Sequence, residues 1–297
     1  MTAAERGFLL LSSHLGDPER KPLTAAQLRT LGERMKLMEK PAEDRELEAK
    51  DLIALGYRPE MAKRILQLLD DEQLLDYYID KGKNFGCIPV TRVSTGYPLL
   101  LRQRLGLDSP GVLWAKGDVS LLSEPMVALV GSREQKNENR AFAEEVGRQA
   151  ALQGYVLVSG NARGADKAAQ NACLASGGRV ISVVADELAK QPLLERVLYL
   201  SEDGYSEAFS SQRALSRNRV IHALGTRTFV AQSNLKMGGT WDGTVKNLRF
   251  GWSGIWCYDD GSEAMTLLSQ MGANLIGMEE LKSFYDLPEN EQIRMDR

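Results

Sequence analysis

The sequence predicts an α/β fold in which a small all-helical domain precedes a doubly wound, mostly parallel sheet. Helix-capping patterns and helical spacing of apolar residues occupy the first ninety residues, whereas apolar runs of strand length alternate with helical segments after about residue 125. A chain of 297 residues is also long enough for about two domains. We therefore expect a helical N-terminal domain over residues 1–90 and an α/β domain over residues 91–297.

Short helices are expected throughout the N-terminal region. Thr24 stands three residues before Gln27, which is the spacing of a capping box, so a helix is expected to begin directly after Thr24. Further helices are expected over residues 46–55, from Pro59 onwards and around residues 74–79.

Buried strands are predicted where continuous apolar runs of four to six residues occur. Helices predicted at about residues 140–152 and 165–175 separate the first three runs, and this alternation is typical of βαβ units with right-handed crossovers. The predicted strands are residues 126–130, 155–158, 179–184, 228–231 and 254–258.

Composition excludes several classes of protein. Lys and Arg number 37 against 40 Asp and Glu, which gives a net charge of −3, so no overall positive field attracts nucleic acid. No apolar stretch approaches the roughly 20 residues that span a bilayer. The N-terminus also lacks the pattern of a secretory signal. We expect a protein of the cytoplasm with no membrane segment.

Cysteine and histidine do not form a metal-binding pattern. Cys87, Cys173 and Cys257 are widely spaced and include no C-x-x-C pair, so buried or incidental thiols are expected. His14 and His222 have no second ligand type at a useful spacing. We expect no metal and no cofactor, and we interpret His222 as an ordinary helix residue.

Candidate binding residues follow the predicted strands, because ligands of an open parallel sheet lie at the carboxyl ends of its strands. Two loops combine glycine or serine with arginine, and backbone amides at the start of a helix favour phosphate. An Arg-Asn-Arg segment and a glycine turn complete the set. The candidates are Ser132, Arg133, Ser159, Gly160, Arg163, Gly164, Arg217, Asn218, Arg219, Lys236, Gly238, Gly239 and Thr240.

Charge is unevenly distributed along the chain. Residues 205–250 contain seven bases and two acids, an excess of +5, whereas residues 43–80 contain eleven acids and five bases. A local basic excess indicates a phosphate partner, so the nucleic-acid surface is expected in the second domain. Among the nearby aromatics, Trp241 and Trp252 are candidate base-stacking residues, and Trp256 is expected to pack in the core.

Several runs of the sequence occur in an order that resembles one family. The runs are VALVGSRE, VSGNARGAD, AAQNACLASGGRVISVV, LSE, RNRVIHAL, GGT and GANLI, preceded by Tyr97-Pro98-Leu99 and the segment 110–117. Together they resemble the DNA-processing protein A (DprA/Smf) family over roughly Tyr97 to Leu281. The resemblance implies a Rossmann-like domain that binds single-stranded DNA without catalysis and passes it to a RecA-type recombinase. It places the family's phosphate-binding positions on the candidate loops, and we expect a homodimer.

Two other functions remain open from the sequence. Divergent relatives of this fold occur in phage-defence and toxin–antitoxin operons, so an antitoxin-like or ligand-sensing regulator of a partner protein is one alternative. The second is a nucleotide phosphoribohydrolase-like enzyme, because Gly238-Gly239-Thr240 faintly resembles that family's phosphate turn. Such chemistry, as that family implies, needs a glutamate soon after the turn, where this chain has Val245, Lys246 and Asn247.

Overall fold

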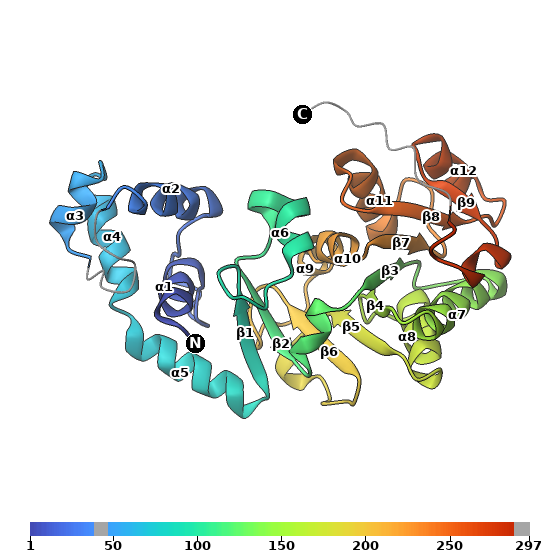
Figure 1. Cartoon of the computed structure of the whole chain (residues 1–297), viewed down its shortest axis with the longest axis horizontal. Coiled ribbons are helices and arrows are strands. Elements are labelled where there is room, and N and C mark those ends of the chain that lie inside the picture. Colours follow the sequence, from blue (N-terminus) through green and yellow to red (C-terminus); the bar gives the residue numbers. More distant parts are fainter. Residues whose placement is uncertain (39–46, 288–297) are drawn as a thin grey trace.

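The computed structural model describes residues 1–38 and 47–287. A cluster of five helices lies at one end of the molecule, beside a long sheet that carries helices on both faces (Figure 1). Part of the predicted acidic run, Glu43 to Glu46, lies outside the described residues.

The N-terminal helices begin where the capping residues predict. The Thr24 side chain and Gln27 form the expected capping box, and Thr2 and Glu5 form a second one that the sequence analysis missed. The helices are α1 (Ala3–Ser12), α2 (Ala25–Met35), α3 (Ala49–Ala54), α4 (Pro59–Leu69) and α5 (Glu72–Asn84). The first strand follows at Cys87, and the division into domains near residue 90 stays a prediction.

Arg20 holds the connections between these helices together. Its buried guanidinium donates to the carbonyl oxygens of Ser13, Leu10 and Leu68, at 2.6, 2.7 and 2.9 Å. Its Nε donates to Asp71 at 2.9 Å. One side chain thus bonds to the end of α1, the end of α4 and the turn before α5, satisfying carbonyl groups that helix ends leave free.

The sheet has nine strands in the order β1-β2-β6-β5-β4-β3-β7-β8-β9. The seven strands β6, β5, β4, β3, β7, β8 and β9 all pair in parallel, whereas β2 runs antiparallel to both β1 and β6. The predicted mostly parallel sheet is confirmed. The strands are β1 (Cys87–Thr91), β2 (Val112–Lys116), β3 (Met126–Val130), β4 (Val156–Ser159), β5 (Arg179–Val183), β6 (Val197–Ser201), β7 (Arg227–Val230), β8 (Gly254–Tyr258) and β9 (Asn274–Ile276).

Helices cover both faces of this sheet, as a doubly wound fold requires. The α-helices after α5 are α6 (Leu99–Leu105), α7 (Asn137–Leu152), α8 (Ala165–Ala175), α9 (Ser211–Ser216), α10 (Asn218–Leu224), α11 (Gly238–Phe250) and α12 (Glu263–Gln270). Short 3-10 helices lie at Gly106–Asp108, Val119–Ser123, Leu188–Lys190 and Glu279–Lys282. No helix in the described part of the chain is both long and apolar enough to cross a membrane.

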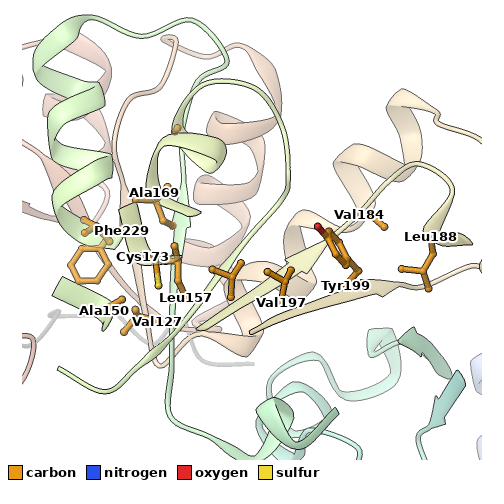
Figure 2. Close-up of a cluster of buried hydrophobic side chains, with 14 of the residues drawn as sticks. Val127, Ala150, Leu157, Ala169, Cys173, Val184, Leu188, Val197, Tyr199 and Phe229 are labelled. Carbon is orange, nitrogen blue, oxygen red and sulfur yellow. The ribbon is translucent and has the colours of Figure 1, made fainter. Parts of the chain in front are cut away.

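Two hydrophobic clusters fill the space on either side of the sheet. Helices α7 and α8 contribute to one cluster, and α6, α10 and α12 contribute to the other. Figure 2 shows part of the first, in which Leu157 and Phe229 of the strands lie beside Ala169 and Cys173 of α8. The three cysteines are buried free thiols, as expected, and burial raises the pKa of Cys173 to about 11.

An aromatic cluster joins α5 to the sheet. The Tyr78 ring lies 4.5 Å from the Tyr205 ring and 5.2 Å from the Trp114 ring, measured between centroids. The Tyr205 hydroxyl also donates to the carbonyl oxygen of Tyr78 at 2.9 Å. Leu9 and Leu10 of α1 belong to the same buried cluster. Helices α1 and α5 therefore share one core with the sheet on this face, whereas α2, α3 and α4 pack around a separate cluster.

Gly147 lets α7 and α8 pack closely. A Cβ atom at this position would lie 2.0 Å from the carbonyl oxygen of Ala169. Gly147→Ala is therefore expected to lower the free energy of unfolding by about 1–3 kcal/mol, despite the better helix propensity of alanine. Urea unfolding measures it. In the matched control, Gly32→Ala in α2, the new Cβ meets nothing within 4 Å, and stability should rise slightly. A stable Gly147→Ala variant would contradict the close packing.

Candidate functional site

A pocket of about 220 Å³ opens at the carboxyl edge of the sheet. Four separate connections supply its walls: the loop after β3, the loop after β4, the end of β5, and the segment from β6 to α10. The pocket is lined by Arg133, Gly160, Asn161, Ala162, Arg163, Ala185, Asp186, Phe209 and Arg217. Four candidates from the sequence, Arg133, Gly160, Arg163 and Arg217, therefore line one pocket, which we call the arginine pocket.

Arg217 is the buried base of the arginine pocket. The residue is only 8% exposed, and its Nε has no hydrogen-bond partner among the described residues. Burial lowers the pKa of Arg217, although the Asp166 carboxylate partly offsets this effect. A guanidinium remains protonated in proteins, and among the described residues no acid lies within ion-pair distance of this buried charge, although Asp166, Asp186 and Glu202 act on its pKa from farther away. Such a group is well suited to receive an anion.

Gly160 makes room for the Arg217 guanidinium. A Cβ atom on Gly160 would lie 1.4 Å from Nη1 of Arg217, so the guanidinium lies against the bare backbone of the β4–α8 loop. Because the backbone of Gly160 does not have a positive φ, close approach explains the glycine better than backbone strain does.

Asp166 holds the loop that carries Arg163. Its carboxylate accepts a hydrogen bond from the Ala162 amide at 3.0 Å. Burial raises the pKa of Asp166, and the nearby Arg217 guanidinium acts in the opposite direction. Asp166 is the second residue of α8, and Gly164 is the N-cap of this helix. The Asp166 side chain therefore bonds to the loop before the helix and does not occupy the N-cap position.

Arg133 and Arg163 form the exposed side of the arginine pocket. Within the described part of the chain, neither side chain lies within ion-pair distance of an acid, so both guanidinium groups are available to a ligand. Gly164 sets their separation, because its Cβ would lie 2.4 Å from the Arg133 carbonyl oxygen and its φ is +83°. The two loops can approach this closely only with glycine there.

The arginine pocket lies to one side of the point where the strand order reverses, between β3 and β7. At that point the Ser132 amide donates to the Gln232 carbonyl oxygen at 3.0 Å and links the loops after β3 and β7. The Ala165 amide donates to the Ser132 carbonyl oxygen at 3.2 Å and links the loops after β3 and β4. Ser132 therefore connects loops, and its amide is not free to bind an anion.

Two further candidates are engaged away from the arginine pocket. The Ser159 hydroxyl is fully buried and accepts from Gln170 at 2.7 Å, so it supports the loop from below. Arg219 pairs with Glu202 at 2.6 Å and donates to the Asp108 carbonyl oxygen at 3.1 Å. Their polar atoms are already bonded within the fold, and phosphate binding by these two side chains stays a prediction.

The glycine turn forms a separate group at the start of α11. Asn218 links it to α10 by donating to the Gly239 carbonyl oxygen at 3.0 Å. Lys236 is exposed and has a positive φ of 54°. The lining of the arginine pocket includes none of this group, which comprises Asn218, Lys236, Gly238, Gly239 and Thr240. Their role in binding stays a prediction.

The basic excess over residues 205–250 overstates the available positive charge. Arg213 pairs with Asp203 at 2.8 Å, and Lys246 pairs with Asp242 at 2.8 Å. With the Arg219–Glu202 pair, three of the seven bases are compensated. Two of the acids, Glu202 and Asp203, lie just before the counted segment, so the sequence count could not include them.

The structure alters the set of aromatic residues that are candidates for base stacking. Trp252 is only 8% exposed and packs in the core, so the expectation that it stacks with bases is corrected. Trp241 is partly buried against the same cluster. Phe209 was missed: it is 55% exposed and lines the arginine pocket. It follows no periodic pattern, since it lies in the loop between β6 and α9.

His222 is buried in α10, outside the lining of the arginine pocket. Its Nδ1 accepts from the Asn247 side chain at 3.0 Å. Burial lowers the pKa of His222 to about 3. Its position within a helix agrees with the interpretation from the sequence.

This pKa predicts a loss of stability in acid. Because the unfolded chain binds a proton below about pH 6.5 and the folded chain does not, the free energy of unfolding is expected to fall by about 2 kcal/mol between pH 6.5 and pH 5. Urea unfolding at pH 7 and pH 5 measures the change. The variant His222→Gln should lack this part of the pH dependence. An unchanged dependence in the variant would assign the effect to other groups.

The central part of the chain, residues 89–246, matches the family model described as DNA recombination-mediator protein A. The match covers more than half of the chain. The chain belongs to this family. Membership confirms the resemblance inferred from the ordered sequence runs, and every residue that lines the arginine pocket lies inside the matched region.

Two relatives in this family are DNA processing proteins DprA. The protein from Streptococcus pneumoniae strain R6 is 35% identical over 145 residues, 44% of this chain and 50% of the relative. The protein from Bacillus subtilis strain 168 is 30% identical over 182 residues, 56% of this chain and 58% of the relative. The chain thus spans 50% and 58% of the length of these two curated relatives.

Two solved structures share the fold. The X-ray structure of DprA from S. pneumoniae has a TM-score of 0.73 at 24% identity and covers 97% of this chain and 100% of that one. A structure of DNA processing protein A from Helicobacter pylori, described for its single-stranded DNA binding mode, has a TM-score of 0.55 at 21% identity, covering 66% and 94%. The predicted Rossmann-like fold is thereby confirmed.

Proposed function

We propose that this protein binds single-stranded DNA through the arginine pocket, in DNA processing and recombination, with no catalysis of its own. The observation that carries the proposal is Arg217, a buried guanidinium that lines the pocket, leaves its Nε unbonded and forms no ion pair among the described residues. Family membership supports the proposal, as does the single-stranded DNA binding mode named for the H. pylori protein.

The chemistry of the arginine pocket favours a phosphate backbone as the ligand. Three guanidinium groups converge from three different loops, and guanidinium binds phosphate oxygens with paired hydrogen bonds. Phosphate contacts carry no sequence information, so binding should be largely independent of base sequence. Residues outside the pocket, including Lys236 and the glycine turn, would extend the same contact along the strand.

Two further parts of the proposal rest on the family resemblance. We infer that the bound strand is passed to a RecA-type recombinase and that the protein acts as a homodimer in the cytoplasm. Co-purification with the recombinase and light scattering of the isolated protein test these parts separately from DNA binding.

Fluorescence anisotropy with a labelled 20-nucleotide oligothymidine tests the binding function. If the three arginines neutralise three phosphates, the slope of log K against log salt should be about −2. Arg133→Ala and Arg163→Ala should each weaken binding, whereas Arg148→Ala, on the distant end of α7, should not. A flat salt dependence, or equal affinity of the Arg133, Arg163 and wild-type proteins, would overturn the proposal.

A separate assay tests the absence of catalysis. Purified protein is incubated with nucleoside monophosphates, and free base is measured by chromatography. Release of base above the buffer control, lost in the Arg217→Met variant, would favour the phosphoribohydrolase-like alternative over a pure binding function.

A further inference from the structure

We propose that the N-terminal helices contain a second binding site, an apolar pocket between α2 and α4 that takes a small aromatic molecule with one polar group. Both helices belong to the cluster at one end of the molecule (Figure 1). The pocket, which we call the α2–α4 pocket, has a volume of about 190 Å³ and shares no lining residue with the arginine pocket. It lies outside the region matched by the family model, so family membership does not account for it.

Apolar side chains form much of the wall of the α2–α4 pocket. Leu23 and Ile65 are at most 5% exposed and belong to the buried cluster of the N-terminal helices, and Met61 packs against this cluster. A methionine side chain adapts its shape to a neighbour, and its sulfur makes favourable contacts with aromatic rings. The volume exceeds the roughly 150 Å³ of an apolar cavity that is known to hold benzene. One aromatic ring with a small substituent therefore fits.

Tyr57 provides a buried polar group that has no partner. It lines the α2–α4 pocket, and its hydroxyl makes no hydrogen bond to any described residue. Two other polar groups of the lining are already bonded within α2 and its cap. The Thr30 hydroxyl donates to the Ala26 carbonyl oxygen, and the Gln27 side chain accepts from the Thr24 amide, both at 3.0 Å. A buried hydroxyl without a partner costs free energy, so a ligand that bonds to it is favoured over a purely apolar one.

Arg34 holds the Tyr57 ring in place without lining the α2–α4 pocket. Its guanidinium lies over the ring, 4.4 Å from the centroid. The Tyr57 amide donates to the Leu52 carbonyl oxygen at 3.0 Å, which fixes the backbone. A ring positioned before the ligand arrives lowers the ordering cost of binding. Burial raises the pKa of Tyr57, although the Arg34 charge acts in the opposite direction, so the phenol keeps its proton at neutral pH.

The size of the apolar surface favours a free small molecule over the side chain of a protein partner. A stable protein interface needs a much wider contact area than one pocket of this volume. The large apolar side chains that are well exposed on the described N-terminal helices lie outside the lining of the α2–α4 pocket. They are Met1, Leu37, Ile53 and Tyr77.

Two probes of nearly equal shape test the site: p-cresol, which carries a hydroxyl group, and p-xylene, which has a methyl group in its place. The readout is the methyl signal of Met61 in NMR spectra of the full chain labelled with carbon-13 at its methionine methyl groups. Wild type should bind p-cresol about 2- to 10-fold more tightly than p-xylene, because one hydrogen bond between neutral groups is gained. Tyr57→Phe should bind the two probes equally. Comparison with Met61→Leu assigns the signal.

Controls separate the pocket from the rest of the surface. Tyr77→Phe removes the hydroxyl of a 64% exposed tyrosine outside the lining and should keep the preference for p-cresol. Ala26→Phe should fill the α2–α4 pocket and block both probes, whereas Ala4→Phe, on α1 and outside the lining, should block neither. Circular dichroism checks that each variant is folded.

Three outcomes would overturn the inference, and each is independent of DNA binding. The first is a Met61 signal that neither probe shifts at millimolar concentration. The second is an unchanged preference for p-cresol in Tyr57→Phe. The third is tighter binding of N-acetylphenylalaninamide than of p-cresol, which would show that the pocket receives a side chain of a protein partner.

Discussion

Gly160→Ala is expected to weaken single-stranded DNA binding by about 10- to 100-fold, the value of a hydrogen bond to a charged group. The new methyl group would occupy the position of the Arg217 guanidinium, 1.4 Å from Nη1, and would displace it from the pocket. No charge is removed by Gly160→Ala, so the loss of affinity would come only from the displaced Arg217 guanidinium. Anisotropy with oligothymidine measures the affinity.

Arg217→Met should produce a similar loss, because it removes the group that Gly160 accommodates. The double variant should lose no more affinity than the weaker-binding single variant, since both changes act on one interaction. Arg148→Met is the matched control for the loss of one positive charge, because it lies on α7 in an exposed pair with Glu145. Fully additive losses in the double variant would show that Gly160 acts independently of Arg217.

Replacing Arg20 with methionine is expected to lower the free energy of unfolding by about 3–5 kcal/mol. The change leaves three carbonyl oxygens without their donor, those of Leu10, Ser13 and Leu68. Methionine retains most of the aliphatic stem, so the loss reflects hydrogen bonding rather than packing. Urea unfolding followed by circular dichroism measures the change.

The control for Arg20 is another arginine of the N-terminal helices. Arg29 forms an exposed pair with Glu33, and both side chains are more than half exposed. Arg29→Met should change the free energy of unfolding by no more than about 0.5 kcal/mol. A loss below about 1 kcal/mol in Arg20→Met would mean that water replaces the guanidinium at the three carbonyl groups.

Much of the sheet could be predicted because its central strands are buried on both faces. The strands at 126–130 and 254–258 agree with the prediction at both ends. Strand β6 was missed because no helix of ordinary length separates it from β5, and no glycine marks its start. The antiparallel strands β1 and β2, at one edge of the sheet, lie before residue 125 and so before the region in which apolar runs alternate with predicted helices.

The site was predictable at the level of loops but not of individual side chains. The Arg-Asn-Arg segment pointed to α10, but residues two positions apart on a helix face in different directions. Arg217 therefore reaches the arginine pocket while Arg219 bonds to Glu202. Phe209 and Asp186 could not be identified, because the shape of an irregular loop depends on contacts such as those of Arg213.

The aromatic cluster of Tyr78, Trp114 and Tyr205 bears on how the molecule unfolds. Since α5 covers Trp114 and Tyr205, release of the N-terminal helices would expose two large rings that are now at most 1% accessible. The free-energy cost of exposing these rings couples the N-terminal helices to the sheet. Both should therefore melt in one cooperative transition with equal calorimetric and van't Hoff enthalpies. The N-terminal helices then act as a structural part of the sheet's edge and not as a freely hinged module.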